Sequence, residues 1–541
     1  MLLFGGVFAQ TAAVALRSTL ASDERALAAN ITIQAIKDAT ATLSSPEMEG
    51  RGTMQPGGEK AAAWIAERFK ALGMKPLGDK ASFLQKVDFR ETVYTPETSF
   101  KVGDESFRFG KDFAFQSLPF KRTDKEKSGE MIFIAYGIQA ASIKRDDLEG
   151  IDVRGKVVVM IEGPPASINK DSWDKAEASS AIFLNLVRAG VAGIVYIAHG
   201  REKEAPETMI DYYGRRSVSL AGGAEEPEPF PLPLLVSVGT PMAEKLFAKS
   251  GISLKDALAR AEENTFKPVK LNQTAKIVAK SKSTKGTSPN VVGYIEGSDP
   301  KLKEEAILFS AHYDAFGTEN GKVYPGAADN GLGTAEMLAV AEAFSKSPVK
   351  PKRSLIFLAV TAEEYGLFGS KYWAKNPTWN IKKVSANLNL DGVGTEVYGP
   401  VKTMVGYGAE HSTLGAMLTD VSAAMGIVVA PDPVPDEKVF YRSDHYSFVE
   451  RGVPALMLMG APEGDIQNAM KRMREWEKTD YHQPGDIIRP DWSWDGAKTV
   501  ADVMGIMGLR LANADSMPEW LSTSRFAKLE RGNTKELPEE K

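Results

Sequence analysis

The chain of 541 residues contains no cysteine. Disulfide bonds, thiolate metal sites and lipid attachment through an N-terminal cysteine are therefore excluded. This absence does not decide the compartment, because a chain of this length can bury a core large enough to be stable without disulfides. Histidine is also scarce, with five residues in all, so each histidine that lies near acidic residues becomes a candidate ligand.

The sequence also lacks internal repeats, low-complexity tracts and, before the polar stretch at 535–541, any block of like charge. Its 66 basic and 71 acidic residues leave a net charge of −5, whereas a nucleic-acid-binding protein would usually present a basic face. After the N-terminus, no apolar run reaches the roughly 20 residues of a membrane span. We therefore expect neither a nucleic-acid partner nor an integral membrane span.

The first sixteen residues, "MLLFGGVFAQTAAVAL", carry no charge. They are interpreted as the remnant of a secretory signal, an apolar stretch followed by Ala13-Val14-Ala15 as a cleavage site of the A-x-A kind. The usual positive residues before the apolar stretch are missing, and the alternative is a short apolar helix packed on the domain. A signal would make the protein secreted or periplasmic.

The pattern before residue 300 indicates one domain interrupted by another. Residues 57–72 predict an amphipathic helix, and residues 86–120 alternate as short strands do. From 128 the character changes to apolar strands with glycine at their ends, and "AKSKSTKGTSPN" (279–290) is interpreted as a linker. We therefore predict a β-rich insert within a split domain, with these bounds: split domain 30–127 and 281–512, insert 128–280, polar C-terminal tail 513–541.

After residue 291 the sequence alternates between strand and helix patterns. Five near-continuous apolar runs are typical of strands that are buried on both faces, as in a parallel or mixed sheet covered by helices. They lie at 305–312, 354–364, 384–391, 402–408 and 454–460. The predicted fold class is α/β, with a mixed and mostly parallel sheet.

Polar residues follow three of these strands. The first run ends at His312, with Asp314 next along the chain, the second ends at the adjacent pair Glu363-Glu364, and the third ends at Asp391. In open α/β sheets, ligands bind at the carboxyl ends of the strands. Residues that lie about 80 positions apart can therefore meet at one edge of the sheet.

Two further loops carry the same chemistry. Asp329 lies in the glycine-rich "GAADNGLG", and His482 lies in "TDYHQPGD", between Tyr481 and Asp486. Each residue alone has a structural explanation, such as a turn or a helix cap. Together, two imidazoles with several carboxylates and no thiol suit a hydrolytic zinc site, with Mn²⁺ or Co²⁺ as alternatives. Five ligands with a shared carboxylate suit two metal ions.

The neighbouring acids Glu363 and Glu364 need a reason, because adjacent carboxylates repel each other. On extended backbone their side chains point in different directions, so one can bind a metal while the other faces the substrate as a general base. Nearby metal ions would also relieve the repulsion.

Six motifs, "SAHYDAFG", "GAADNGLG", "TAEEYGLFGS", "NLNLDGVG", "SDHYSF" and "YHQPGD", resemble in order and spacing those of the secreted co-catalytic zinc aminopeptidases. That family includes glutamate carboxypeptidase and glutaminyl cyclase. "LSSPEMEGRGTMQPGGEKAAAWIAERFKALGMKP" is similar to the N-terminal region of the same family, and the stretch at about 128–275 resembles a protease-associated domain. The resemblance covers roughly residues 35–510, and it implies peptide substrates and a zinc exopeptidase fold.

The resemblance also implies a role for each matched ligand. His312 and Asp391 would hold one zinc ion, Glu364 and His482 the other, and Asp329 would bridge the two. Glu363 would take the proton from the attacking water, and Tyr481 would help to stabilise the oxyanion.

Other matched residues would support these ligands. Asp314 and Asp486 would orient the neighbouring histidines, and Asp444 and His445 of "SDHYSF" would belong to the pocket wall, so His445 is not counted as a ligand. The remaining histidines, His199 and His411, match no motif.

Three alternatives remain on the same scaffold. A carboxypeptidase or dipeptidase would need a basic cluster for the terminal carboxylate of its substrate, and Arg442 is one candidate for it. A glutaminyl cyclase uses one zinc and lacks the first histidine, and a receptor-like binding module would have lost its ligands. Five aromatic residues near the motifs hint at a pocket for apolar side chains, although they could equally be core: Phe316, Tyr365, Phe440, Tyr446 and Phe448.

Overall fold

The computed structural model describes residues 19–116, 124–168, 178–198, 206–221, 232–392, 394–462, 465–535 and 537. Segment 1–16, interpreted above as a signal, lies outside the described residues. The chain divides into two compact units: unit 1 comprises Met1–Phe89 and Gly286–Lys541, and unit 2 comprises Arg90–Lys285. None of the described helices combines the length and the apolar character that a membrane crossing requires.

The boundaries between the units differ from the expected ones. Unit 2 begins near residue 90 rather than 128, because the short strands β3 (Ser99–Val102) and β5 (Phe113–Phe115) pair with its other strands. The expected linker at 279–290 is instead largely strand β14 (Ser281–Ile295). Its Lys, Ser and Thr residues are mostly exposed or half-buried, so the polar composition of a surface strand resembled that of a linker.

Unit 1 is built on a mixed sheet. Its central strands run parallel in the order β18 (Ser354–Val360), β15 (Ala306–His312), β19 (Val384–Asn389) and β22 (Ala455–Pro462). The strands β14 and β20 (Val401–Tyr407) flank them in the antiparallel sense. The outer positions belong to β2 (Leu84–Tyr94), with β11 (Ser217–Leu220) beyond it, to β1 (Lys75–Pro76) and to β21 (Val428–Ala430). This confirms the predicted fold class.

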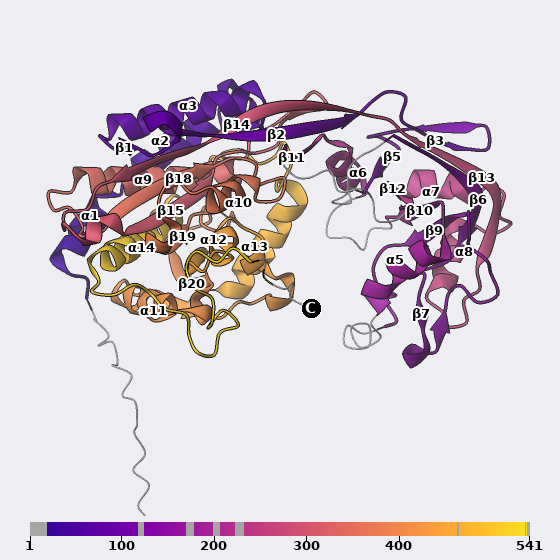
Figure 1. Cartoon of the computed structure of the whole chain (residues 1–541). Coiled ribbons are helices and arrows are strands. Elements are labelled where there is room, and N and C mark those ends of the chain that lie inside the picture. The colour runs from indigo at the N-terminus through magenta and orange to yellow at the C-terminus, as the bar shows by residue number, and fades with distance from the viewer. Residues whose placement is uncertain are drawn as a thin grey trace, which may run out of the picture. The chain divides into compact units, whose positions relative to one another are not determined.

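Helices cover both faces of this sheet (Figure 1). The reason is the alternation of side chains along each strand. Ile307 and Phe309 of β15 belong to one apolar cluster, whereas Leu308 belongs to another. The first cluster includes α1 (Ser22–Asn30), α2 (Ile33–Leu43), α3 (Pro56–Ala71), α9 (Gly333–Lys346), α11 (Leu414–Ala424) and α14 (Asp495–Asn513), and the second includes α10 (Phe368–Lys375) and α12 (His445–Val449). Helix α3 confirms the helix predicted at 57–72.

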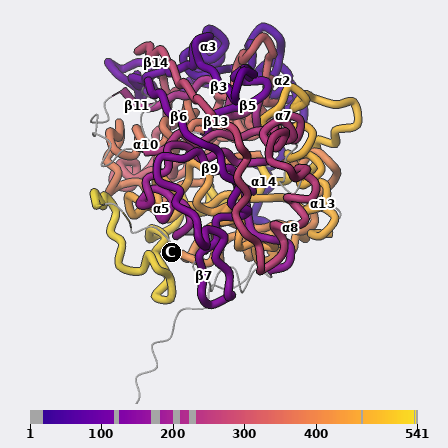
Figure 2. The backbone as a smooth tube through the Cα atoms, turned by 90° about the vertical axis from the view of Figure 1, so that its right-hand side faces the viewer, coloured from indigo at the N-terminus to yellow at the C-terminus, as the bar shows by residue number. Residues whose placement is uncertain are grey.

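Unit 2 has its own sheet and its own core. The strand order is β4-β3-β13-β6-β9-β10-β12-β5. Helix α5 (Ala178–Ala189) packs on one face, and α7 (Thr240–Leu246) and α8 (Leu254–Ala261) pack on the other (Figure 2). The remaining bounds are β4 Glu105–Arg108, β6 Lys125–Phe133, β7 Gln139–Ala140, β8 Arg145–Asp146, β9 Val157–Ile161, β10 Gly193–Ile197, α6 Pro206–Gly214, β11 Ser217–Leu220, β12 Leu234–Val238 and β13 Val269–Ala279.

The segment after α14, expected to be a polar tail, packs on unit 1 over its described part. Phe526 is only 2% exposed. Arg531 donates hydrogen bonds to the carbonyl oxygens of Val384 and Ser385 at the start of β19. The composition is polar, but a few large side chains and backbone contacts fix the segment in place.

Candidate metal centre

The carboxyl ends of the parallel strands bring the predicted ligands together. His312 is the last residue of β15, and Asp391 follows the end of β19 by two positions. Their Nε2 and Oδ1 atoms lie 3.3 Å apart. Because neighbouring parallel strands end at the same edge of a sheet, a separation of 79 positions in sequence becomes a direct contact.

The remaining ligands approach this edge from loops. Glu363 and Glu364 follow β18, Asp329 lies in the turn before α9, and His482 lies just after α13 (Ile466–Thr479). The six side chains form two groups, within each of which the candidate ligand atoms lie within 4.8 Å of one another. One group is His312, Glu363 and Asp391, and the other is Asp329, Glu364 and His482.

The Asp329 carboxylate lies between the two histidines. Its Oδ1 is 3.3 Å from Nε2 of His312, and its Oδ2 is 3.4 Å from Nε2 of His482. Each carboxylate oxygen therefore faces a different group. This is the arrangement that a carboxylate shared by two cations requires.

The adjacent glutamates diverge. Glu364 Oε2 lies 2.9 Å from Nε2 of His482, whereas Glu363 Oε2 lies 3.9 Å from Nε2 of His312. Glu364 is almost fully buried, and Glu363 also lines the adjoining cavity. Glu363 thus belongs to the ligand group of His312, and Glu364 belongs to that of His482. Of the two glutamates, only Glu363 borders the adjoining cavity.

The two acids expected to orient the histidines behave differently from each other. The His312 Nδ1 atom lies 3.2 Å from the main-chain oxygen of Asp314 and 3.7 Å from its carboxylate. The Asp314 carboxylate also accepts a hydrogen bond from the backbone N–H of Glu363. Asp314 therefore links the first histidine to the glutamate pair.

Asp486, by contrast, supports the Asp329 loop. Its carboxylate accepts hydrogen bonds from the backbone N–H groups of Ala328, at 2.9 Å, and Asp329, at 3.0 Å. The family resemblance implied His482 as its partner. The folded turn presents two backbone donors that this carboxylate satisfies together.

Asp444 and His445 are fully buried and join neither ligand group. Burial raises the pKa of Asp444 to about 7 and lowers the pKa of His445 to about 3, because both charged forms are poorly solvated. The His445 ring packs 5.2 Å from that of Phe440. His445 is therefore a neutral side chain behind the loop that precedes α12.

The centre contains more acidic than basic side chains, with four carboxylates facing two imidazoles. Burial would lower the pKa of His482, but Glu364 and Asp329 outweigh it and raise this pKa to about 9. Burial would likewise raise the pKa of Asp329, but contacts with His312 and His482 hold it below the ordinary value. Burial also raises the pKa of Glu364 to about 7. The side chains therefore share protons among themselves when no cation is bound.

Tyr481 packs against the second histidine. Its ring centre is 3.6 Å from that of His482 and 5.0 Å from that of Trp476. Burial raises the pKa of Tyr481 well above its ordinary value, and the nearby carboxylates of Asp329 and Glu364 act in the same direction. The phenol therefore keeps its proton and can donate a hydrogen bond at the edge of the cavity.

Sequence reasoning missed the role of Arg51, which holds the loops around the centre. Its guanidinium is fully buried and donates to the main-chain oxygens of Tyr313, Leu43, Pro325 and Gly326, at 2.6 to 2.7 Å. Burial lowers the pKa of Arg51 to about 10, so it remains charged at neutral pH. Arg51 lies in "EGRG", within the N-terminal stretch that resembles the family, but this motif does not indicate which groups the arginine binds.

Two other polar residues were also missed. The Asn330 side chain donates to the Leu390 carbonyl and accepts from the backbone N–H groups of Gly333 and Gly392. The Ser443 hydroxyl donates to the Asp391 carboxylate. Both tie the Asp391 loop to its neighbours.

A cavity of about 100 Å³ adjoins the centre. Its apolar wall consists of Tyr407, Val439, Met457, Met473 and Trp476, and its charged residues beyond the ligands are Glu437, Arg442 and Glu477. Arg442 is the one basic residue of this lining, and within the described chain no ion pair or side-chain hydrogen bond is found for it.

The aromatic residues expected to line a pocket lie elsewhere. Phe316 packs 4.8 Å from the ring of His482 and 5.9 Å from that of Tyr365, and Phe448 is buried against Trp373. Phe440, in the loop before α12, contacts Tyr446 of that helix. None of the five aromatic residues belongs to the lining of the cavity, whose apolar wall is formed by other residues.

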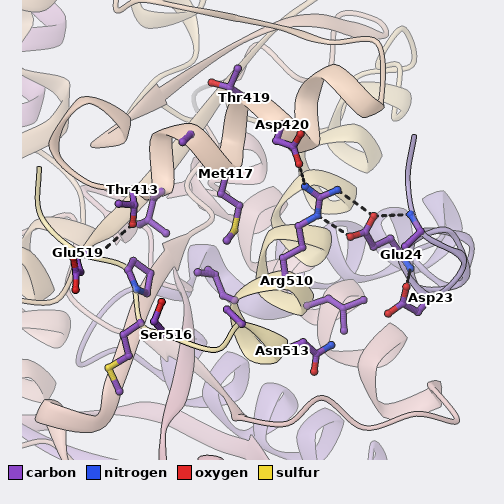
Figure 3. A pocket seen from close by; sticks show the side chains of 18 residues that line it. Asp23, Glu24, Thr413, Met417, Thr419, Asp420, Arg510, Asn513, Ser516 and Glu519 are labelled. Carbon is purple, nitrogen blue, oxygen red and sulfur yellow. Dashed lines mark hydrogen bonds and ion pairs between the residues drawn. The ribbon is translucent and has the colours of Figure 1, made fainter. Parts of the chain in front are cut away.

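A larger cavity of about 920 Å³ lies on unit 1 away from this chemistry (Figure 3). At its edge Arg510 pairs with Glu24 and Asp420. Its lining contains none of the candidate ligands. The size of a cavity is therefore a poor guide to the site in this molecule.

Comparisons with known proteins bear on the family and the fold of the chain. Residues 290–506 match Peptidase family M28. A vacuolar membrane protease of Clavispora lusitaniae is 39% identical over 107 residues, which are 20% of this chain and 10% of that protein. The chain thus aligns with only about a tenth of the length of these curated relatives.

Solved structures share the fold over most of the chain. An aminopeptidase from Aneurinibacillus sp. strain AM-1 has a TM-score of 0.57 at 21% identity, covering 90% of this chain and 95% of the other. A zinc aminopeptidase from Bacillus subtilis gives 0.55 at 16% identity, covering 93% and 98%. A peptidase M28 precursor from Shewanella amazonensis SB2B gives 0.52 at 16% identity, covering 92% and 98%. Residues 290–506, which contain all six motifs, therefore form a domain of Peptidase family M28.

Proposed function

We propose that the chain is a zinc-dependent exopeptidase that removes N-terminal residues from peptides. The observation that supports this most strongly is the Asp329 carboxylate, whose two oxygens face the imidazoles of His312 and His482. The donor set fits the proposed ions, because imidazole nitrogens and carboxylate oxygens without thiolates are typical of hydrolytic zinc sites. His312 and Asp391 would hold one ion, Glu364 and His482 the other, with Asp329 shared.

The metals would supply Lewis-acid chemistry, lowering the pKa of water towards about 7 and polarising the peptide carbonyl. Glu363 would accept the proton of the attacking water and pass it to the leaving amine, a role supported by the position of this residue in the cavity lining. Tyr481, which also lines the cavity and keeps its proton, would donate a hydrogen bond to the oxyanion.

The lining favours an amine over a carboxylate as the recognised terminus. Acidic residues outnumber the single Arg442 among the residues that border the cavity. A free α-amine, which carries a positive charge near neutral pH, would accept this environment more readily than a second anion. The apolar wall formed by Val439, Met457 and Trp476 would receive an apolar side chain of the substrate.

The test is a panel of leucyl and alanyl anilides with free or acetylated amines, assayed with and without chelator. We expect hydrolysis of the free-amine substrates, little action on the acetylated ones, and loss of activity with chelator.

A second candidate is a carboxypeptidase, favoured by Arg442, whose guanidinium could bind a terminal carboxylate. Efficient removal of the C-terminal residue from N-acetylated dipeptides would overturn the aminopeptidase and establish this alternative.

Unit 2 is proposed to be a protease-associated domain that contributes no ligand. Both candidate ligand groups lie in unit 1. Deletion of Arg90–Lys285 with a short connection should then leave metal binding intact and raise KM more for peptides than for small anilides. Equal effects on both kinds of substrate would favour a purely stabilising role.

Action outside the cytosol follows from the interpretation of the N-terminal segment as a secretory signal, and N-terminal sequencing of the mature protein tests it.

A further inference from the structure

The segment after α14 contacts the loop that forms one wall of the active-site cavity. This wall loop, residues 435–443, contains Glu437, Val439 and Arg442 of the cavity lining, together with Ser443, which binds the Asp391 carboxylate. Between these lining residues lie Phe440 and Tyr441. The described C-terminal segment, residues 514–535, contacts both of them.

The aromatic contacts centre on Phe526. Its ring lies 6.0 Å from that of Phe440 and 4.9 Å from that of His411, and the His411 ring is in turn 4.9 Å from that of Phe440. Trp520 covers Phe526 at 5.3 Å. The buried Phe526 therefore occupies the space behind Phe440.

Polar contacts fix the same segment beside the wall loop. Arg525 donates a hydrogen bond to the Tyr441 hydroxyl at 3.2 Å, and its guanidinium lies 5.9 Å from the centre of that ring. Ser524 Oγ lies 3.3 Å from Nδ1 of His411. The backbone N–H of Leu521 donates to the His411 carbonyl at 2.9 Å. These bonds fix the position of Phe526 along the loop.

One apolar cluster joins the segment to the cavity lining. It contains Phe526 together with Tyr407, Met457 and Met473, three residues that border the cavity, and Phe440 is also a member. Protein interiors are close-packed, so a void behind Phe440 would let the wall loop move. Displacement of the wall would change how well a substrate side chain fits, while the metal ligands on the strand ends stay in place.

We propose that the C-terminal segment 514–535 is a support for the substrate-binding wall, and that Phe526 is a positioning residue for substrate specificity. The expected change in KM rests on the proposed function, whereas the expected change in the mobility of the wall loop does not. The support acts through Phe440 and Tyr441, since Phe526 does not border the cavity itself.

The test compares Phe526→Leu with Phe69→Leu, a matched control. Phe69 is also a buried phenylalanine of unit 1, but it lies on α3 and packs against Phe83, away from the wall loop. A third variant, Arg525→Ala, alters an exposed side chain and should fold normally. Truncation after Asn513 is less informative, because it would also remove the Arg531 contacts with β19.

Two measurements are made on each full-length variant. Hydrogen–deuterium exchange of the amides in 434–446 should accelerate in Phe526→Leu and Arg525→Ala but not in Phe69→Leu. The KM for leucyl anilide should rise roughly 3- to 10-fold in Phe526→Leu, with kcat changed by less than about twofold and with unchanged metal content.

The outcomes separate this inference from the proposed function. If wild-type protein hydrolyses none of the anilides, the proposed function fails, and the exchange experiment still decides whether the segment supports the loop. Unchanged exchange at 434–446 in both segment variants would overturn the support. Equal acceleration there in Phe69→Leu would also overturn it, because the effect would then be general destabilisation.

Discussion

Replacement of Arg51 by methionine should both destabilise the protein and weaken metal binding. Methionine approximates the length of the arginine stem but has no donor. The guanidinium donates four hydrogen bonds, to the carbonyls of Tyr313, Leu43, Pro325 and Gly326. Tyr313 follows the ligand His312, and Gly326 precedes the Asp329 turn, so Arg51 ties together the loops that carry two candidate ligands.

The size of the effect follows from these bonds. Hydrogen bonds to a charged group contribute about 1.5–3 kcal/mol each, so four of them represent a gross contribution of about 6–12 kcal/mol. Burial of the guanidinium opposes this contribution, as its lowered pKa indicates. Removal of one partner from a buried charged network typically costs about 3–5 kcal/mol, and we expect Arg51→Met to lose this much free energy of unfolding.

Arg353 provides a matched control. It is equally buried, and it donates to the Glu305 carboxylate and to the carbonyls of Leu511 and Ala514. These partners lie next to the amino end of β15 and at the carboxyl end of α14, whereas His312 and Asp391 lie at the carboxyl ends of the strands. Arg353→Met should therefore lower the free energy of unfolding without changing the zinc dissociation constant.

The assay is denaturant unfolding of the metal-free proteins, followed by zinc titration against a competing chelator. We expect the zinc dissociation constant of Arg51→Met to rise about 10- to 100-fold, as is usual when the groups that orient metal ligands are removed. An unfolding free energy within about 1 kcal/mol of wild type, or zinc affinities that fall equally in both variants, would refute this account of Arg51.

Three further predictions concern the centre and its surroundings. Elemental analysis of purified protein in zinc-supplemented buffer should give about two metal ions per chain, and a fully active protein with a single ion would contradict the shared role of Asp329. Glu363→Gln should keep both ions and lose roughly 10²–10⁴-fold in kcat, whereas Glu364→Ala should lose metal; turnover near wild type in Glu363→Gln would reverse the assignment of the pair. Glu396 is buried, and its charge affects the ionisation of the buried Glu336. Burial raises the pKa of Glu396 to about 7. The protonated form of Glu396, which stabilises the folded state, is therefore lost as the pH rises through about 7. Relative to Glu396→Gln, wild type should therefore lose up to about 1.4 kcal/mol of stability per pH unit as the pH rises from about 4.5 to about 7, and no more above that. Parallel stability curves for the two proteins across this range would show that this proton is not held.

The sequence predicted best what depends on local pattern. His312 and Asp391 were identified because each closes an apolar run, and the carboxyl ends of parallel strands must meet. Arg51 could not be interpreted in this way, because three of its four acceptors are main-chain carbonyls that lie 262 to 275 positions away. A main-chain carbonyl leaves no trace in the identity of its residue, so no pattern pairs it with a distant arginine.

The cavity wall was missed for a related reason. Met457 lies on β22 and Met473 on α13, within elements whose other apolar residues are core, so their exposure to the cavity depends on packing rather than on periodicity. The unit boundary near residue 90 was missed because β2 continues through it as an unbroken strand. A boundary inside a strand causes no change of composition.

The centre combines two kinds of positioning with different physical demands. The ligands on strand ends, such as His312, are placed by the sheet itself and need only one neighbouring bond, here from Thr334 to the His312 carbonyl at 2.7 Å. Asp329 lies in a turn that Arg51 and Asp486 hold from distant parts of the chain, and the neighbouring Asn330 side chain ties the same turn to Leu390. Because the shared carboxylate must face both histidines at once, a small shift of its turn would affect both groups. Buried polar contacts from several parts of the chain therefore meet at the turn of the shared ligand, which the sheet does not place.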